Sequence, residues 1–381
     1  MLAMRNGWTE TSLGEIAEVI GGGTPSTAIA EYWDGNIVWL TPTEITSQDG
    51  KVVSDSIRKI TELGFKNSGA QMLPIDSVIL TSRASVGYVA LAGKDLCTNQ
   101  GFQSLVPKQS VLSKFLMFWI QQNRSEFESR SAGSTFKEIS KSNVKSIKLQ
   151  LPPLSDQKRI VDLISSVDFY IEALQQQLES AKRSRNAVLH ELLTAGGDDW
   201  VETTLGEVTE CSWGNTETTK SKYVDSGYLA YSASGADGFL DWFDHDGTAV
   251  VLSAIGAQCG KTWFAEGKWT SIKNTIWLKS NNLSLLDKYL FYLSNGDQFW
   301  QIRGQAQPFI SLGDVKKTKV FLPPLQEQNR IIGITESLDK VETELELTIA
   351  EAQNLRSGLL SDLLSGKHEI PSSYDKVIGA A

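Results

Sequence analysis

The chain contains the stretch Leu151-Pro152-Pro153-Leu154 and, 171 positions later, the stretch Leu322-Pro323-Pro324-Leu325. Each stretch is followed at the same spacing by a glutamine and then by an arginine–isoleucine pair. These residues are Gln157, Arg159 and Ile160 in the first copy and Gln328, Arg330 and Ile331 in the second. Because an internal repeat dictates the architecture of a chain, the sequence predicts two half-molecules joined head to tail.

Apolar residues follow each copy at steps of four and three. The positions are Ile160, Ile164, Val167, Ile171, Leu174 and Leu178 after the first copy and Ile331, Leu338, Leu345 and Ile349 after the second. This heptad spacing is typical of a helix that buries one stripe against another helix. The paired prolines place the start of each helix just after them, with Ser155 as a possible N-cap. Each helix should span roughly 40 residues, or about 60 Å.

Polar residues interrupt this stripe at a few positions. Thr335 and Glu342 take the place of apolar residues in the second helix. Arg185 and Arg356 occupy the same stripe position in the two copies. Either both arginines extend into solvent where the stripe frays, or they fix the register of the helices or bind a partner. We favour the first interpretation.

The segments that precede the two helices begin and end alike but diverge between those ends. Short runs of β-forming residues, bounded by Gly, Pro, Asp and Ser, lie at 37–40, 77–80, 87–91 and 147–151 and again at 248–252, 261–264 and 275–278. Helical stretches are expected near 111–127 and 284–302. The predicted fold class is therefore α+β, with a mixed sheet and a few helices in each variable segment.

The expected organisation has five parts: variable domains at 1–150 and 200–321, helix segments at 151–199 and 322–370, and a tail at 371–381. The net charge of −9 is spread unevenly over them. Residues 151–199 and 322–381 together carry 10 Lys and Arg against 18 Asp and Glu, whereas the variable domains have net charges of +1 and −2. Near-neutral domains bind phosphates weakly, so a basic partner would have to share any contacts with nucleic acid.

Composition also suggests a compartment. No apolar run approaches the ~18 residues of a membrane span, and the first residues lack a secretory apolar region. The three cysteines, Cys97, Cys211 and Cys259, form no Cys-x-x-Cys pair. We therefore expect a reduced, cytoplasmic protein that does not contact a membrane.

The combined pattern resembles the specificity subunits of type I restriction–modification systems, over nearly the whole chain. The most specific part is the repeated Leu-Pro-Pro-Leu block, which leads a heptad helix after a divergent domain; residues 37–42, 97–102 and 304–311 are also similar. The resemblance implies two target recognition domains that each read half of a split, asymmetric double-stranded DNA sequence. It also implies that the two helices pack antiparallel as a coiled coil, with a pseudo-two-fold relationship.

The resemblance further implies partners. The helices would dock two methyltransferase (modification) subunits and, where the cell has them, restriction or translocase subunits. S-adenosylmethionine, and ATP with Mg²⁺, would then belong to those partners. The chain itself would have no cofactor and no catalytic site.

Polar side chains near the ends of the expected strands are candidates for DNA contacts. Arginine pairs with guanine and glutamine with adenine in the major groove, whereas small hydroxyl residues commonly contact phosphates. Ordinary turn formation is the competing explanation. The candidates are Thr41, Thr43, Arg83, Asn99, Gln100 and Lys137 in the first domain and Ser232, Ser234, Gln258, Lys261, Lys273, Asn274, Gln305 and Gln307 in the second.

Catalytic motifs are absent from the sequence. Residues 256–262 have three residues between two glycines, where a phosphate-binding loop needs four. The chain has no Asn-Pro-Pro-Tyr or Asp-Pro-Pro-Tyr, no dinucleotide-binding glycine pattern after a strand and no zinc-ligand spacing. The acidic run at 241–246 favours a solvated turn over a cation site, so no metal is expected.

Two other functions stay open at this point. The chain could be an enzyme with a cryptic nuclease or methyltransferase site, which binding of S-adenosylmethionine by the single chain would indicate. It could also be a coiled-coil adaptor or DNA-mimic inhibitor that binds restriction–modification proteins, for which the acidic helices give some support. Such an adaptor would compete with DNA for its partner, whereas a specificity subunit joins the partner on DNA.

Overall fold

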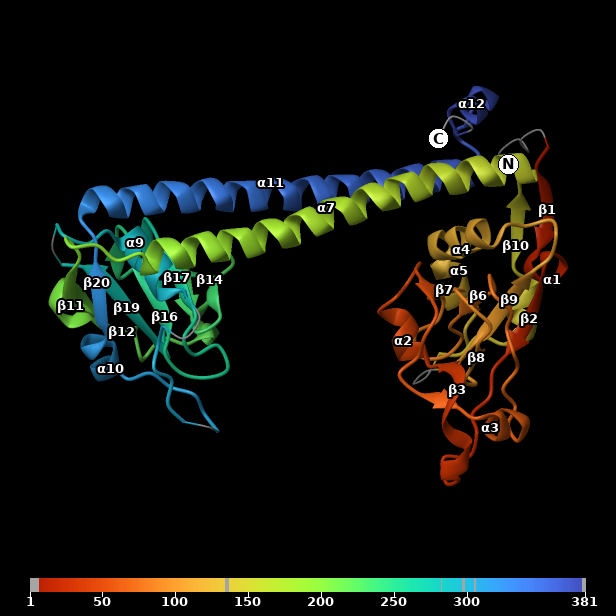
Figure 1. Cartoon of the computed structure of the whole chain (residues 1–381), viewed down its shortest axis with the longest axis horizontal. Coiled ribbons are helices and arrows are strands. Elements are labelled where there is room, and N and C mark those ends of the chain that lie inside the picture. Colours follow the sequence, from red (N-terminus) through yellow and green to blue (C-terminus); the bar gives the residue numbers. More distant parts are fainter. Residues whose placement is uncertain (1–6, 134–136, 282, 297–298, 305, 379–381) are drawn as a thin grey trace. The chain divides into compact units, whose positions relative to one another are not determined.

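The computed structural model describes residues 7–133, 137–281, 283–296, 299–304 and 306–378 (Figure 1). The chain divides into two compact units. Unit 1 comprises Met1–Ala173 and Ile349–Ala381, and unit 2 comprises Leu174–Thr348. Each unit therefore contains one variable domain together with parts of both repeated helices.

Two long helices occupy the repeated segments: α7 spans Leu154–Thr194 and α11 spans Leu325–Leu364. Their lengths of 41 and 40 residues confirm the prediction from the heptad spacing. Both helices begin directly after the paired prolines, which cannot donate a backbone hydrogen bond. The N-cap prediction is wrong by position, because Ser155 lies inside the first turn of α7.

The two helices run in opposite directions within each unit. In unit 1, Asp168 from the first half of α7 pairs with Arg356 near the end of α11. In unit 2, Arg185 near the end of α7 pairs with Asp339 from the first half of α11. Since the start of one helix meets the end of the other in both units, the antiparallel arrangement is confirmed.

The heptad stripe faces inward in both helices. Ile160 and Ile164 join the core of unit 1 with Leu360 and Leu363, and Ile331 joins the core of unit 2. Among the predicted stripe positions, Ile160, Ile164, Ile171, Leu174, Ile331 and Ile349 are buried and Val167, Leu178, Leu338 and Leu345 are partly exposed.

The polar interruptions of the stripe have different local environments. Thr335 is buried, and its hydroxyl donates to the carbonyl of Ile331 at 2.8 Å, so the helix backbone itself satisfies it. Glu342 is half-buried, and its Oε1 is enclosed without a hydrogen-bond partner. Enclosed polar atoms without a partner cost stability, so Glu342 interrupts the stripe unfavourably.

The variable domain of unit 1 is a mixed α+β structure. A two-stranded antiparallel pair, β1–β10, precedes the long helix, and a five-stranded sheet has the order β2-β9-β6-β7-β4 beside a three-stranded sheet of order β5-β3-β8. The strands are β1 Thr9–Ser12, β2 Ala17–Gly21, β3 Trp33–Leu40, β4 Val52–Val53, β5 Lys59–Ile60, β6 Val78–Leu80, β7 Val89–Ala92, β8 Cys97–Thr98, β9 Gln103–Pro107 and β10 Lys148–Leu151. The helices are α1 Leu13–Ile16, α2 Pro42–Thr46, α3 Glu62–Lys66, α4 Ser113–Gln122, α5 Arg124–Ser129 and α6 Lys141–Ser146.

The variable domain of unit 2 follows a similar plan. The pair β11–β20 corresponds to β1–β10, and two four-stranded sheets have the orders β12-β19-β16-β17 and β14-β13-β18-β15. The strands are β11 Val201–Thr204, β12 Thr209–Trp213, β13 Tyr228–Ser232, β14 Gly235–Leu240, β15 His245–Asp246, β16 Ala249–Ser253, β17 Thr262–Ala265, β18 Lys268–Ser271, β19 Thr275–Ser280 and β20 Lys319–Leu322. The helices are α8 Leu205–Val208, α9 Asp287–Ser294 and α10 Leu312–Lys317, and the chain ends its described part with α12 Asp375–Ile378.

One predicted helix is much shorter than the sequence suggested. Among the described residues of the expected helical stretch at 284–302, the α-helix is α9, which ends at Ser294. Asn295 and Gly296 follow at once, and both residue types favour the end of a helix. The corresponding stretch at 111–127 is also interrupted, because α4 and α5 meet at Asn123.

The repeated glutamine fastens each long helix to its variable domain. Gln157 is fully buried; its Nε2 donates to the carbonyls of Ser110 and Pro152 at 3.0 and 2.9 Å, and its Oε1 accepts the backbone N–H of Leu112 at 2.8 Å. Leu112 is the N-cap residue of α4, so the side chain satisfies a helix end that would otherwise lack a partner.

Gln328 repeats this arrangement in unit 2. It donates to the carbonyls of Ser284 and Pro323 at 2.7 and 2.9 Å and accepts the backbone N–H of Leu286, the N-cap of α9, at 2.9 Å. A buried amide that uses both its donors and its acceptor is a specific connection. The sequence repeat therefore encodes a repeated joint between scaffold and domain.

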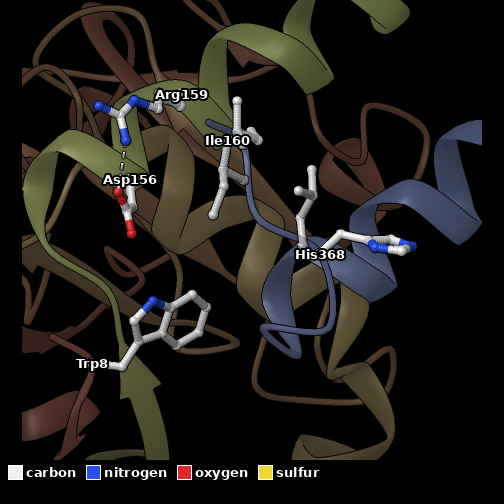
Figure 2. Close-up of a pocket in the computed structure, with 7 residues that line it drawn as sticks. Trp8, Asp156, Arg159, Ile160 and His368 are labelled. Carbon is white, nitrogen blue, oxygen red and sulfur yellow. Dashed lines mark hydrogen bonds and ion pairs between the residues drawn. The ribbon is translucent and has the colours of Figure 1, made fainter. Parts of the chain in front are cut away.

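The tail of the chain packs against the first turn of α7 in unit 1. Arg159 forms two hydrogen bonds with the carboxylate of Asp375, at 2.7 and 2.6 Å, and a third with Asp156 at 3.1 Å. A cavity of only about 10 Å³ lies beside them, lined by Trp8, Ile160 and His368 among others (Figure 2). That volume holds at most a single water molecule, so this cavity is a packing defect and not a ligand site.

Candidate nucleic-acid interface

Four loops of unit 1 are joined side by side through backbone hydrogen bonds. Asn99 N–H donates to Leu40 at 3.0 Å, and Ser82 N–H donates to Gly101 at 2.8 Å. Ile139 N–H then donates to Ser82 at 2.9 Å, and Ala84 N–H donates to Lys137 at 3.0 Å. We call these loops, at residues 41–44, 82–87, 99–101 and 137–139, loop edge 1.

The same series of bonds exists in unit 2. Ile272 N–H donates to Tyr231 at 2.9 Å, and Ala254 N–H donates to Asn274 at 2.9 Å. Ile310 N–H donates to Ala254 at 2.8 Å, and Gly256 N–H donates to Pro308 at 2.9 Å. We call the loops at 232–235, 254–261, 272–274 and 306–310 loop edge 2. The two variable domains therefore build equivalent edges from different residues.

The backbone is left-handed at both edges. Ala84 has φ +63°, which is strained for alanine, whereas Asn274 has φ +73°, which asparagine adopts more readily than most residues. The position equivalent to Ala84 is Gly256, which adopts φ +106° without that penalty. Strained non-glycine residues concentrate at ligand-binding loops, because surrounding structure must hold them in place.

Loop edge 1 brings together all six sequence candidates of the first domain: Thr41, Thr43, Arg83, Asn99, Gln100 and Lys137. Arg83 and Lys137 are exposed, and the ion pair from Arg83 Nε to Glu138 Oε2 is loose at 3.8 Å. A guanidinium held this weakly keeps its donors available for a nucleic acid. Thr43 is also exposed, one residue beyond the start of α2.

Three of these six side chains have structural partners. Thr41 Oγ1 donates to Glu44 Oε2 at 2.6 Å as part of a capping box at α2. Asn99 Oδ1 accepts the N–H of Gly101 at 2.8 Å, and exposed Gln100 accepts a hydrogen bond from Thr24. These contacts shape the loops, and they leave the amide NH₂ groups of Asn99 and Gln100 as the remaining donors for base contacts.

Loop edge 2 gathers most of the second set of candidates. Ser234, Gln258, Lys261, Lys273 and Gln307 are exposed on it, and Asn274 is half-buried. Ser232 is buried; its hydroxyl donates to Asp237 at 2.7 Å and accepts the N–H of Ser234 at 3.0 Å. Ser232 therefore supports the loop from within and is the candidate least able to touch DNA directly. Gln305 lies outside the described residues.

A recess adjoins loop edge 2. It has a volume of about 350 Å³ and is lined by residues that include Lys261, Trp263, Asn295, Trp300 and Ile302. Its lining combines the exposed Lys261 with the aromatic side chains of Trp263 and Trp300.

The sequence did not single out the two carboxylates that organise these edges. Glu44 is buried under loop edge 1, where Oε1 accepts the N–H of Ile57 at 2.7 Å and Oε2 accepts the N–H of Thr41 at 2.9 Å. Asp237 has the same role under loop edge 2 and also binds Lys220 and Tyr223. Glu44 completes the Thr41-Pro42-Thr43-Glu44 capping box, a local sequence signal that could have identified it. Asp237 belongs to no such motif, and the fold brings Lys220 near it.

The acidic run at 241–246 is organised by aromatic stacking. His245 stacks on Trp269 with ring centroids 4.2 Å apart, and burial lowers the pKa of its imidazole. Within the described ranges, no group of three or more His, Cys, Asp or Glu residues is arranged to hold a metal ion. Over those same ranges, no helix is both long and apolar enough to cross a membrane.

The sequence is similar to a known protein family and to individual members of it. A sequence model of the family described as "Type I restriction modification DNA specificity domain" matches residues 5–183 and 197–352. The MjaIX specificity subunit of Methanocaldococcus jannaschii is 23% identical, over 94% of this chain and 93% of the relative. The EcoprrI specificity subunit of Escherichia coli is 24% identical, over 91% of this chain and 90% of the relative.

Solved structures have the same fold. The S subunit of a type I restriction–modification system from M. genitalium aligns with a TM-score of 0.56 and 17% identity, covering 97% of this chain and 99% of that one. A chain from a study of complex assembly and conformational transition in a type I system aligns with a TM-score of 0.67 and 17% identity, covering 96% and 99%.

Proposed function

This chain belongs to the type I restriction–modification DNA specificity family, and on that premise we propose that loop edges 1 and 2 are its two DNA-reading surfaces. The membership confirms the family expected from the sequence. In this proposal the chain is the non-catalytic specificity subunit of a complex, and it reads an asymmetric, bipartite target in double-stranded DNA.

The observation that carries the proposal is the equivalence of the two edges. The same four backbone hydrogen bonds join the same loops in each domain, yet the exposed side chains differ. Arg83 and Lys137 stand on one edge, and Gln258, Lys261 and Lys273 on the other. A protein that recognises two different half-sites needs the same backbone arrangement with different exposed side chains. The reason is that base edges are distinguished by their hydrogen-bond donors and acceptors.

The domain boundaries are part of the proposal. Residues 1–150 and 200–321 serve as recognition domains, 151–199 and 322–370 as the scaffold, and 371–381 as a tail. Fully buried Gln157 and Gln328 support these boundaries, because they fasten the scaffold to α4 and α9 through hydrogen bonds. A rigid joint is needed if the scaffold is to hold each reading edge in a fixed direction.

We assign the scaffold, together with the adjoining surface of the second recognition domain, a second role: the docking of two methyltransferase subunits and, where present, restriction subunits. An apolar recess of about 540 Å³ in unit 2, where residues of that domain meet the start of α11, supports this role. Leu283, Val201 and Leu325 line it with exposed fractions of 92%, 63% and 39%. Exposed apolar surface of this kind marks protein contacts. S-adenosylmethionine, ATP and Mg²⁺ would be held by these partners, and the partner would take the target adenine out of the DNA stack.

The proposal is tested by exchanging one domain. Residues 1–150 are replaced by the corresponding domain of another family member, and methylated sites are sequenced in a host that supplies the methyltransferase. One half of the recognised sequence should change and the other half should persist. An unchanged sequence, or strong binding of S-adenosylmethionine by the isolated chain, contradicts the proposal.

A further inference from the structure

A polar cluster with Asp237 at its centre lies in the second variable domain. Asp237 Oδ2 accepts hydrogen bonds from Lys220 Nζ at 2.5 Å and Ser232 Oγ at 2.7 Å, and Oδ1 accepts one from Tyr223 at 2.9 Å. Burial opposes ionisation of this carboxyl, but the three donors outweigh burial and lower its pKa. The carboxylate is therefore charged and fully engaged around neutral pH.

Two glycines hold this cluster in one conformation. Gly235 has φ +109°, which lets the chain turn directly from β13 into β14. At Gly238 an added Cβ would lie 2.0 Å from the ring of Tyr223, so only glycine lets that ring reach Asp237. Since both turn and ring are fixed by the backbone, the Lys220 ammonium is positioned before any ligand arrives.

The cluster adjoins loop edge 2 and shares Ser232 with it. Thr218, two residues before Lys220, accepts the backbone N–H of Lys273 at 3.3 Å, and Tyr231, one residue before Ser232, accepts that of Ile272 at 2.9 Å. Lys220 lies on a short 3-10 helix at Lys220–Lys222, and its side chain is 55% exposed whereas that of Asp237 is 25% exposed. The ammonium thus faces outward and the carboxylate supports it from below.

The hydrogen bonds of the Lys220–Asp237 pair leave one donor of the Lys220 ammonium available. An ammonium has three donors: one is used by Asp237, and the second lies 3.4 Å from Ser234 Oγ. The third is free to point away from the loop. Because Asp237 neutralises Lys220, the pair attracts phosphate weakly, yet it still offers a fixed donor. A guanine presents two acceptors, N7 and O6, in the major groove, where lysine is among its usual partners.

We propose that Lys220 reads a guanine in the half-site recognised by the second variable domain, with Asp237 as its positioning residue. The inference rests on the proposed function and adds a base and a residue to it. Glu44, the organising carboxylate of loop edge 1, instead accepts hydrogen bonds from Thr41 and from the backbone of Ile57. None of these described hydrogen bonds holds a lysine, so the two domains differ in this arrangement.

The test compares Lys220→Ala with Lys222→Ala in the complex with the methyltransferase. Lys222 is an exposed lysine at the other end of the same 3-10 helix, so both variants remove one positive charge from one place. Sequencing of methylated sites should show that Lys220→Ala loses its preference for guanine at one position, by about tenfold. Lys222→Ala should keep the wild-type sequence, and Lys220→Arg should keep the guanine because arginine also pairs with it.

Asp237→Asn is the second variant. It should weaken the preference for guanine at the same position of the recognised DNA sequence, although Lys220 itself is unchanged. Thermal unfolding of each complex separates a reading defect from a folding defect. An unchanged recognised sequence in Lys220→Ala overturns the proposal. Lys220→Ala could instead weaken methylation of all sites equally and reduce the salt dependence of DNA binding. That result would identify Lys220 as a phosphate contact and would also overturn the proposal. If the wild-type complex methylates no specific sequence, the proposed function fails instead.

Discussion

Arg185 donates from Nε to Asp339 Oδ1 at 2.8 Å across the helix pair, and Arg356 pairs with Asp168 at the equivalent place in the other unit. The side chains of Arg185 and Arg356 are only 17% and 21% exposed. The interpretation that these arginines extend into solvent is therefore wrong. Each one instead lies against an aromatic ring of the variable domain: Tyr292 in unit 2 and Phe118 in unit 1.

The two ion pairs differ in one hydrogen bond. Tyr292 donates to Asp339 at 3.0 Å, whereas Phe118 has no hydroxyl to offer Asp168. We expect Asp339→Ala to lower the free energy of unfolding by about 2 kcal/mol and Asp168→Ala by about 1 kcal/mol, because partial exposure screens the charges in both. Chemical denaturation measures both values. Glu344→Ala, at an exposed position of α11, is the control and should change stability little.

The buried glutamines give a second prediction. Gln157→Ala leaves the N–H of Leu112 and two carbonyls without partners, so it should cost about 2–3 kcal/mol. Gln157→Glu keeps the shape but removes the two donors, and it should also destabilise the fold. Gln176→Ala on the exposed face of α7 is the matched control. Equal stability of the Gln157 and Gln176 variants in urea would contradict the joint described here.

The strained residue of loop edge 1 gives a third prediction. Glycine at position 84 adopts φ +63° more easily than alanine, so Ala84→Gly should raise the free energy of unfolding by about 0.5–1 kcal/mol. Ala84→Val should lower it, because a β-branched side chain strongly disfavours that conformation. Ala132→Gly, in a neighbouring exposed position, should lower stability slightly. Thermal unfolding distinguishes the three variants.

A fourth prediction concerns pH. Burial lowers the pKa of His245 below its usual 6.5, against the opposing effect of Asp244; Lys279 lowers it further and Glu210 raises it slightly. The folded state therefore binds fewer protons than the unfolded state just below pH 6.5, so stability rises with pH through that window and falls on acidification. Denaturation curves between about pH 7 and pH 5 should show this slope. His245→Phe keeps an aromatic ring stacked on Trp269 and should flatten this pH dependence of stability. An unchanged slope would show that other groups cause the pH dependence.

The long helices could be predicted from sequence because heptad spacing and paired prolines are local signals. Their antiparallel pairing and the family were also accessible, through a resemblance carried by the repeat. The partners of Arg185 could not be predicted, since Asp339 is far away in the chain and only helix packing brings the two together. For the same reason nothing in the sequence marked Asp237 or Lys220, whose contact depends on how the β13–β14 turn folds.

For residues 284–302 the sequence predicts a helix that is longer than the one in the structure. The apolar residues of this stretch are spaced for a helix, but Asn295 and Gly296 end α9 early. The DNA-contacting role of the loop residues stays a prediction. Their common position on two equivalent edges emerges from backbone hydrogen bonds that no periodicity reveals.

Every partner of Gln157 is a main-chain atom: the carbonyls of Ser110 and Pro152 and the N–H of Leu112. Gln328 likewise touches only main chain. These hydrogen bonds therefore do not depend on which side chains the recognition domains carry at the contacted positions. Genes of this design can drift, or recombine with foreign alleles at the scaffold boundary, and still give a protein whose parts fit. A host cell could acquire a new DNA target in a single crossover that leaves both glutamine joints intact.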